Sequence, residues 1–426
     1  MSARSRPTRV AIIGAGPAGA TTALLLARRG ASVVLLDDGR RPELVVGESL
    51  VPLLTAIFQR LGIEEQVRAL GVRKPGVTFA FGEGGDFELS FSALRGVLPN
   101  YAYNVPRKEF DRLLLDTARA AGAGYVETVA KLEAGGDTLR LAPETLALIP
   151  AWAGAQPDVL IDASGRRRLF AKLLGIAAET GPRRDVAHFA HYENAPWPEP
   201  RGQVVIGRLE HGWSWRIPLP GPRLSIGVVL SKERAPRFGA TPEEQLENAI
   251  AHDPRLAAAT GGRRRVTPVA TYANYQLIAA RGAGAGWALV GDAFGFVDPM
   301  LSPGLCMAMS SAERLAAAIP SHGGRTAQTD RALEHYWRWF RDMLGAWQNL
   351  VEYFYDGRIF AIHRAGTAFS KEHPGLVSRL LERHTARHFS GMASGALTAH
   401  PYSRGLLRFL GKNFARPAEA EAFAIR

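Results

Sequence analysis

Short apolar runs alternate with stretches of helical periodicity along most of the chain. Apolar runs bounded by turn residues predict buried strands at residues 10–13, 31–36, 157–162 and 287–292. Apolar positions at helical spacing predict one helix over each of the segments 53–70, 109–118 and 305–319. Because strands that alternate with helices are typical of a parallel sheet covered by helices, the pattern predicts an α/β fold.

Two further regions have different patterns. The segments that follow Pro75-Gly76 and that span about 186–230 alternate apolar and polar residues, which predicts antiparallel strands. We expect them to form an inserted sheet from residues at about 75–105 and 180–280. After residue 328 the pattern is helical, and its aromatic stripe favours core packing over a role in lining a pocket. The expected organisation is a core over 1–330 and a helical C-terminal region over 331–426 that covers the substrate pocket.

The first predicted strand leads into the turn Gly14-x-Gly16-x-x-Gly19, which opens a helix of small and aliphatic residues beginning at Pro17-Ala18. Glycines at this spacing permit a tight turn, a close approach of a pyrophosphate and close helix–strand packing. The helix start adds free N–H groups and a partial positive charge. Asp37 ends the second strand about 20 residues later, at the position that holds a ribose hydroxyl in such folds. We prefer it to the neighbouring Asp38 because it directly ends the strand.

Composition and charge narrow the setting. The 426 residues are 46% hydrophobic and 22% charged, which is typical of a soluble globular protein. The single cysteine, Cys306, excludes an internal disulfide and indicates a reducing, cytoplasmic environment. No apolar run is long enough for a transmembrane segment. The net charge of +12 comes with scattered arginines and no nucleic-acid motif, which favours an Arg-rich surface, with an acidic carrier protein as the alternative partner.

Three later segments resemble class A flavoprotein monooxygenases. Asp162-x-x-Gly165 is similar to their middle motif, Gly291-Asp292-Ala293 to their late motif, and Arg107 to a position that reaches the FAD phosphates. The resemblance implies one FAD and a GR2-type, Rossmann-like three-layer domain with an inserted antiparallel β-sheet substrate domain. It assigns Asp292 to the ribityl chain. No second glycine fingerprint follows a strand, since Gly282-x-Gly284-x-Gly286 precedes one and is interpreted as a loop, so no separate NAD(P)H domain is expected.

The block Trp213-Ser-Trp215-Arg-Ile217-Pro218 narrows the resemblance to flavin-dependent halogenases, in which it is associated with blocking hydroxylation near the flavin. The segment 47–52, with Glu48 and Ser49, resembles the family's flavin-contacting strap. Lys74, in Lys-x-Gly-x-x-Phe, matches the family's catalytic lysine. A core role for the two tryptophans and a surface role for the lysine are the plain alternatives.

The resemblance implies a specific chemistry. Reduced FAD and O2 form a flavin hydroperoxide, chloride or bromide gives hypohalous acid, and Lys74 delivers the halogen to an electron-rich arene. A separate flavin reductase supplies the reduced FAD. The late loop would complete the flavin and halide sites, with Ser302 also catalytic, through Pro299, Ser302, Gly304 and Leu305. Leu301 stands where the tryptophan-specific branch has a glutamate, which favours a phenol or pyrrole, free or carrier-tethered. Pro303 lacks one N–H that the family uses for halide.

Two other functions remain open from the sequence. The same scaffold could hydroxylate an aromatic substrate as a flavin monooxygenase or oxidase, or serve as a non-catalytic flavin-binding tailoring subunit. A metal site is not expected, because His384-x-x-x-His388 lacks a glutamate and a third ligand. His188 and His191 are interpreted as structural histidines, and Cys306 as a packing residue.

Overall fold

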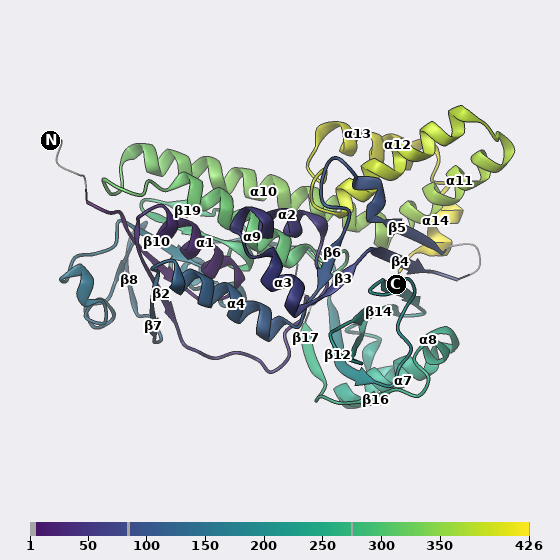
Figure 1. Ribbon diagram of the computed structural model, residues 1–426, viewed down its shortest axis with the longest axis horizontal. Helices are drawn as coiled ribbons and strands as arrows, with labels where there is room; N and C mark the ends of the chain where they lie inside the picture. The colour runs from purple at the N-terminus through teal and green to yellow at the C-terminus, as the bar shows by residue number, and fades with distance from the viewer. Residues whose placement is uncertain (1–5, 83–85, 274–275, 426) are drawn as a thin grey trace.

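A parallel sheet forms the centre of the computed structural model, which describes residues 6–82, 86–273 and 276–425 (Figure 1). Its strand order is β19-β20-β10-β1-β2-β7, and every pairing is parallel except that of β19 with β20. The strands are β1 (Arg9–Ile13), β2 (Ser32–Asp37), β7 (Gly124–Glu127), β10 (Val159–Asp162), β19 (Ala283–Gly284) and β20 (Trp287–Leu289). The four predicted buried strands are therefore confirmed, whereas the interpretation of 282–286 as a loop was wrong, since β19 pairs there in a hairpin.

Helices cover this sheet and connect its strands. Helix α1 packs against both α4 and α9, and α9 packs against α10 (Figure 1). These helices are α1 (Pro17–Arg28), α4 (Arg107–Ala120), α9 (Pro303–Ala318) and α10 (Ala327–Tyr355). The predicted single helix over 53–70 is two helices, α2 (Pro52–Leu61) and α3 (Glu64–Leu70). Gly62 ends α2 with a φ of +67°, a conformation that favours glycine, and the chain turns before α3.

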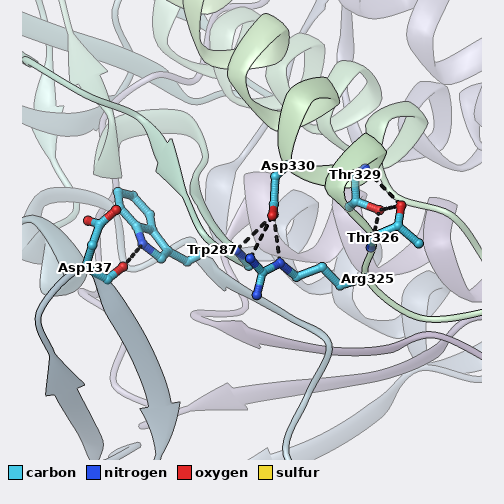
Figure 2. A network of polar contacts seen from close by, with 7 residues as sticks. Asp137, Trp287, Arg325, Thr326, Thr329 and Asp330 are labelled. Carbon is cyan, nitrogen blue, oxygen red and sulfur yellow. Dashed lines mark hydrogen bonds and ion pairs between the residues drawn. The ribbon is translucent and has the colours of Figure 1, made fainter.

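Hydrogen bonds fix the start of α10 against the edge of the sheet (Figure 2). Thr326 and Thr329 form a reciprocal capping box. Asp330, one residue further, accepts hydrogen bonds from the Gly286 backbone N–H at 3.2 Å and from Arg325 at 2.7 Å. On the adjoining strand the Trp287 indole N–H donates to the Asp137 carbonyl at 3.0 Å. The long helix is thus anchored where the sheet ends.

A second, mostly antiparallel sheet stands beside the first. Its order is β16-β12-β15-β14-β13-β4-β5, with β17 also paired to β12, and only β13 and β4 are parallel. Helix α7 packs against β12 and β15 (Figure 1). Its elements are β4 (Gly76–Ala80), β5 (Phe87–Ser90), β12 (Asp185–Glu193), β13 (Val204–Leu209), β14 (Gly212–Pro218), β15 (Leu224–Ser231), β16 (Arg264–Arg265), β17 (Ala270–Ala273), α7 (Pro242–His252) and α8 (Pro254–Ala259).

Smaller elements form three further small sheets, β3-β6, β8-β9 and β11-β18-β21, and short helices. Strand β3 (Val72–Lys74) pairs with β6 (Ala102–Asn104) in a separate ribbon, so residues 102–104 lie outside the large antiparallel sheet. The short 3-10 helix η1 (Phe91–Leu94) follows β5. The remaining elements are β8 (Leu132–Gly135), β9 (Thr138–Leu141), α5 (Pro143–Leu146), α6 (Leu169–Leu173), β11 (Ala178–Thr180), β18 (Leu277–Ala279) and β21 (Gly295–Phe296).

The C-terminal part is helical, as predicted. Its helices after α10 are α11 (Arg358–Glu372), α12 (Leu376–Ala393), α13 (Pro401–Asn413) and α14 (Pro417–Phe423). The aromatic stripe of α10 is packed inside: Phe340, Trp347 and Phe354 are at most 1% exposed. Among the described residues, no helix is long and apolar enough to cross a membrane.

Candidate active site

One cavity of about 470 Å³ lies where the two sheets meet. The segments that follow β1, β10 and β20 form one wall, at the carboxyl ends of the parallel strands, where open α/β sheets bind their ligands. Strands β13 and β14 supply the opposite wall. Its size and its mixture of apolar and cationic lining residues suit an organic ligand that carries phosphates.

Most of the residues predicted from the sequence line this cavity. They are Gly16, Pro17, Ala18, Glu48, Ser49, Arg107, Gly165, Trp213, Trp215, Ile217, Asp292, Pro299, Ser302, Gly304 and Leu305. Six predicted residues are not among the lining residues: Gly14, Gly19, Asp37, Lys74, Asp162 and Pro218. The first group forms the surface that a ligand would touch, and the second stands behind it.

The glycine turn leaves open space at one end of the cavity. A Cβ atom at Gly16 would meet nothing within 4 Å, and this residue caps the N-terminus of α1. In contrast, Gly14 has a φ of +105°, and a Cβ there would lie 2.4 Å from the Ala163 carbonyl oxygen. A Cβ at Gly19 would lie 2.0 Å from the Gly14 oxygen. The turn thus fits a pyrophosphate: two glycines are needed for packing, and the third leaves room beside free N–H groups.

The acids expected to act near this turn have protein partners of their own. Asp37 accepts hydrogen bonds from the backbone N–H groups of Ala15 (2.7 Å) and Gly39 (2.9 Å), and it pairs with Arg41 at 2.9 Å. Asp38 pairs with Arg167 at 2.6 Å. In the structure Asp37 therefore holds the glycine turn in place, a role that its position at the end of a strand did not reveal.

The middle motif has a similar supporting role. The buried Asp162 carboxylate accepts hydrogen bonds from the backbone N–H groups of Ser164 (2.9 Å) and Phe170 (2.8 Å). Gly165 follows in the turn with a φ of +59°. These bonds shape the turn, so that residues 163–167 reach the cavity.

Cations stand near a partly exposed acid, Asp292, further along the cavity. Burial raises the pKa of Asp292 to about 6, although the positive charges of Arg166 and Arg107 act in the opposite direction. Arg107 donates to the Val46 carbonyl at 2.5 Å and pairs with Asp111 at 3.0 Å. Arg166 is one of the scattered arginines for which the sequence predicts a surface position, but it lines the cavity. Its place directly after the Asp162-x-x-Gly165 motif was the available signal.

The strap is tied to the antiparallel sheet by a buried acid–base pair. Glu48 and His191, on β12, lie 2.6 Å apart, and their side chains are 4% and 6% exposed. Val46, Gly47, Glu48 and Ser49 all line the cavity. His191 was interpreted from the sequence as an isolated structural histidine; the structure places it against the strap. Nothing in the local sequence could pair residues 143 positions apart.

Lys74 lies behind the strap and is fully enclosed by protein. Its Nζ donates to Ser49 Oγ at 2.8 Å and to the Leu50 carbonyl at 2.9 Å. It also stands 5.3 Å from the centre of the Phe91 ring. Burial lowers its pKa to about 7, so both the ammonium and the amine are populated near neutral pH. A surface lysine is thus excluded, and Ser49 connects Lys74 to the cavity.

The aromatic wall is held by a chain of buried hydrogen bonds. Trp213 and Trp215 lie on the same face of β14 with ring centres 5.8 Å apart. The Trp213 indole N–H donates to the Tyr355 hydroxyl at 3.0 Å, and that hydroxyl donates to Asp298 at 3.0 Å. Asp298 also accepts the Met300 backbone N–H at 2.8 Å. The end of α10 thereby joins the tryptophan wall to the late loop.

The late loop enters α9 through a strained turn. Leu301 and Ser302 both have left-handed conformations, with φ of +67° and +57°. Pro303 occupies the first position of α9, where its missing N–H leaves no intrahelical bond unmade but removes one donor at the cavity edge. The backbone N–H of Ser302 donates to the Pro299 carbonyl at 3.0 Å. Gly304 lines the cavity beyond the proline.

The minor candidates have structural partners. His384 bonds to the Tyr402 hydroxyl at 2.8 Å and His388 to Ser403 at 2.9 Å. Within the described ranges, no cluster of His, Cys, Asp or Glu could hold a metal. Cys306 is buried, and that burial raises the pKa of its thiol to about 12. His188 lies between Thr271 and Gln245.

Comparisons with known proteins agree on one family. The family profile described as Tryptophan halogenase matches residues 9–98 and 92–372. A "Tryptophan 2-halogenase" from Chondromyces crocatus is 32% identical over 358 residues, 82% of this chain and 68% of that protein. A "1H-pyrrole-2-carbonyl-[peptidyl-carrier protein] chlorinase" from Pseudomonas fluorescens is 27% identical over 81% of this chain and 83% of its own. The solved structure of the myxobacterial chondrochloren halogenase CndH has 27% identity and a TM-score of 0.70, and the match covers 82% of this chain and 83% of that one.

Proposed function

The chain belongs to the flavin-dependent halogenases, and we propose that it halogenates an electron-rich arene, a phenol or a pyrrole, with Lys74 as the residue that directs the halogen. Members of this family are enzymes that use FAD, halide and O2. The substrate follows from two observations. Leu301 stands where a glutamate would assist attack by tryptophan, and a phenol already carries an activating oxygen. Two relatives are named for their action on a pyrrole bound to a peptidyl-carrier protein, which supports a carrier-tethered substrate as the alternative to a free one.

The residues around the cavity would divide the binding of FAD between them. The open space at Gly16 and the start of α1 would take the pyrophosphate, together with Arg107. Asp292 and the segment Pro299–Leu305 would hold the flavin end, and Ser302 and Gly304 the halide. When bound and reduced, FAD supplies the electrons that let O2 oxidise halide. Reduced FAD would come from a separate reductase.

The chain's own residues would then control where the oxidised halogen goes. The tryptophan wall, locked by Tyr355, would exclude an arene from the flavin end and so oppose hydroxylation there. Lys74 can act in two ways: its ammonium can donate a hydrogen bond to hypohalous acid, or its amine can take the halogen from hypohalous acid, forming an N–halogen bond and releasing water. A pKa of about 7 leaves both forms available at neutral pH. Enclosure keeps this step away from water.

The buried position of Lys74 behind Ser49 is the observation that carries the proposal. Among the described residues Lys74 has no carboxylate partner, and it is 2% exposed; a lysine in such a place is costly to bury, and such groups concentrate at functional sites. A mass-spectrometric assay would offer simple phenols with an external flavin reductase, FAD, NADH and O2, and with chloride and bromide in separate reactions. We expect products whose mass shows an added halogen, and we expect their yield to fall by about 100-fold or more in Lys74→Ala.

The control and the competing outcomes separate the alternatives. Lys108→Ala removes an exposed lysine from α4 and should leave product formation unchanged. An oxygen mass shift that needs no halide would replace the proposal with an aromatic monooxygenase. Tight FAD binding with no product from free or carrier-bound arenes would instead favour a non-catalytic flavin-binding subunit.

A further inference from the structure

Helices α11 and α12 form a hairpin at one end of the molecule (Figure 1). The first half of α12 is exposed although it carries large apolar side chains. Leu376, Val377, Leu380 and Leu381 are 74%, 68%, 55% and 51% exposed. A cluster of uncovered side chains on one short segment is unusual for a surface that meets only water.

Arginines lie beside these apolar side chains on the exposed side of α12. Arg379, Arg383 and Arg387 follow at intervals of four residues, so they form one row along the helix. All three are exposed, while Ser378 turns inward at 5% exposure. We call the four apolar residues and the three arginines the α12 face. It joins an apolar strip to a positive edge.

The surrounding sequence is strongly basic. Residues 358–416 contain ten lysines and arginines against two glutamates, which places +8 of the chain's net +12 in this region. Two copies of the chain that met through this face would bring like charges together, which opposes self-association. The charge therefore favours an acidic partner.

The other end of α12 contacts the segment that lies beside the proposed catalytic lysine. Ser390 donates to the Ser90 carbonyl at 3.5 Å, next to η1, whose Phe91 ring stands over Lys74. From Leu380 to Ser390 the helix rises about 15 Å. A partner on the α12 face would thus lie on the helix that packs against η1, from which a flexible tether could reach toward the site.

We propose that the α12 face docks an acidic carrier protein that presents the arene on its tether. The inference rests on the proposed function and adds to it the partner and the place where that partner binds. The apolar strip would meet apolar residues of the carrier, and the arginine row would meet its carboxylates.

The test measures binding apart from chemistry. The probe is the apo form of the peptidyl carrier protein on which the Pseudomonas fluorescens chlorinase acts, titrated by fluorescence anisotropy at low salt. Wild type should bind it, and a triple Arg379→Glu, Arg383→Glu, Arg387→Glu variant should bind at least tenfold more weakly. Leu380→Ser should also weaken binding. Halogenation of a free phenol should be unchanged in both variants.

A matched control reverses three exposed arginines elsewhere. Arg68, Arg112 and Arg338 are 65%, 79% and 66% exposed and lie on α3, α4 and α10. Their triple change to glutamate makes the same change in net charge and should weaken carrier binding far less. Equal losses in the two triple variants would mean that only net charge matters and would overturn the docking site.

The remaining outcomes are equally decisive. The docking site is wrong if wild type does not bind the carrier protein, or if Leu380→Ser abolishes a dimer seen by sedimentation. Arginine-dependent binding to phosphatidylglycerol vesicles, without carrier binding, would assign the face to a membrane. Carrier binding without any halogenation would defeat the proposed function and leave the docking site standing, whereas turnover of free phenol without carrier binding would do the reverse.

Discussion

The two ends of the cavity are built by opposite means. The glycine end offers empty space and backbone N–H groups, and nothing lies within 4 Å of the position that a Gly16 Cβ would take. The tryptophan end is built from large buried side chains held by each other, such as Trp213, Tyr355 and Asp298. A change at the first end should therefore affect FAD binding without affecting stability, and a change at the second should affect stability with little effect on FAD binding.

The largest effect is expected at the glycine end. Gly16→Val places a branched side chain in the open space intended for pyrophosphate, so FAD affinity should fall at least about 100-fold, or about 2.7 kcal/mol. Its φ of −71° is ordinary for any residue, so the melting temperature should barely change. Fluorescence titration measures the FAD affinity, and thermal denaturation measures the melting temperature.

Gly345→Val provides the control, since a Cβ there also meets nothing within 4 Å but lies on α10 outside the cavity. It should bind FAD as wild type does. Unchanged affinity in Gly16→Val would remove the pyrophosphate from this turn.

Lys74 should make stability depend on pH. Its amine has a pKa of about 7 when folded and about 10.4 when unfolded, so between these values the unfolded chain binds one more proton. Stability from this group therefore increases as pH rises from 7 towards 10, by up to about 1.4 kcal/mol per pH unit. Urea unfolding at pH 7, 8 and 9 should show this increase in wild type relative to Lys74→Met.

Lys108→Met, a change at the surface of α4, should follow wild type at every pH. If the profiles of wild type and Lys74→Met run parallel, Lys74 keeps its proton in the folded protein, and the strap has no titrating amine behind it.

Tyr355→Phe should loosen the tryptophan end alone. The substitution leaves the Trp213 indole N–H without its acceptor and removes one donor to Asp298, which should cost about 1–3 kcal/mol of unfolding free energy. FAD affinity should stay within about twofold of wild type, a difference of about 0.4 kcal/mol.

Tyr402→Phe removes the hydroxyl of an exposed tyrosine on α13. Among the described residues this hydroxyl bonds only to the exposed His384, so its loss should cost far less. Were Tyr355→Phe to weaken FAD binding as strongly as Gly16→Val, the two ends could not be treated as separate.

The smallest effect is expected at Pro303. Pro303→Ala restores a backbone N–H between Ser302 and Gly304, both of which line the cavity. One added donor should lower the KM for bromide about two- to fivefold, which corresponds to about 0.5–1 kcal/mol of binding free energy. The bromide dependence of product formation measures this. An unchanged KM would place the halide away from this turn.

The features that the sequence predicted correctly depend on residues close together in the chain. They are the glycine turn, the four buried strands and the aromatic stripe of α10, and periodicity reveals them. The helix over 53–70 failed because hydrophobic spacing continued through Gly62, whose left-handed conformation ends α2. The spacing of apolar residues indicates which side of a helix is buried, but it does not indicate where the backbone turns.

The features that the sequence could not predict are mostly contacts between two residues far apart in the chain. Tyr355 meets Trp213 across 142 residues, and His191 meets Glu48 across 143. Each of these residues has an ordinary structural interpretation when read alone. Asp37 differs from these residues, because its position at the end of a strand predicts contact with a ribose hydroxyl. In the structure its carboxylate also accepts hydrogen bonds from two backbone N–H groups. The assignment of the site residues to FAD and halide stays a prediction.

The Glu48–His191 pair has a consequence for the time that a ligand stays bound. Strap residues line the cavity, and their link to β12 is a 2.6 Å contact between two nearly inaccessible side chains. Lifting the strap separates that pair before either side chain has gained full contact with water, so the barrier rises on the way in and on the way out alike. A latch of this kind would slow exchange in both directions and leave the equilibrium constant nearly unchanged. If exchange requires the strap to lift, we expect the pair to act on residence time rather than on affinity.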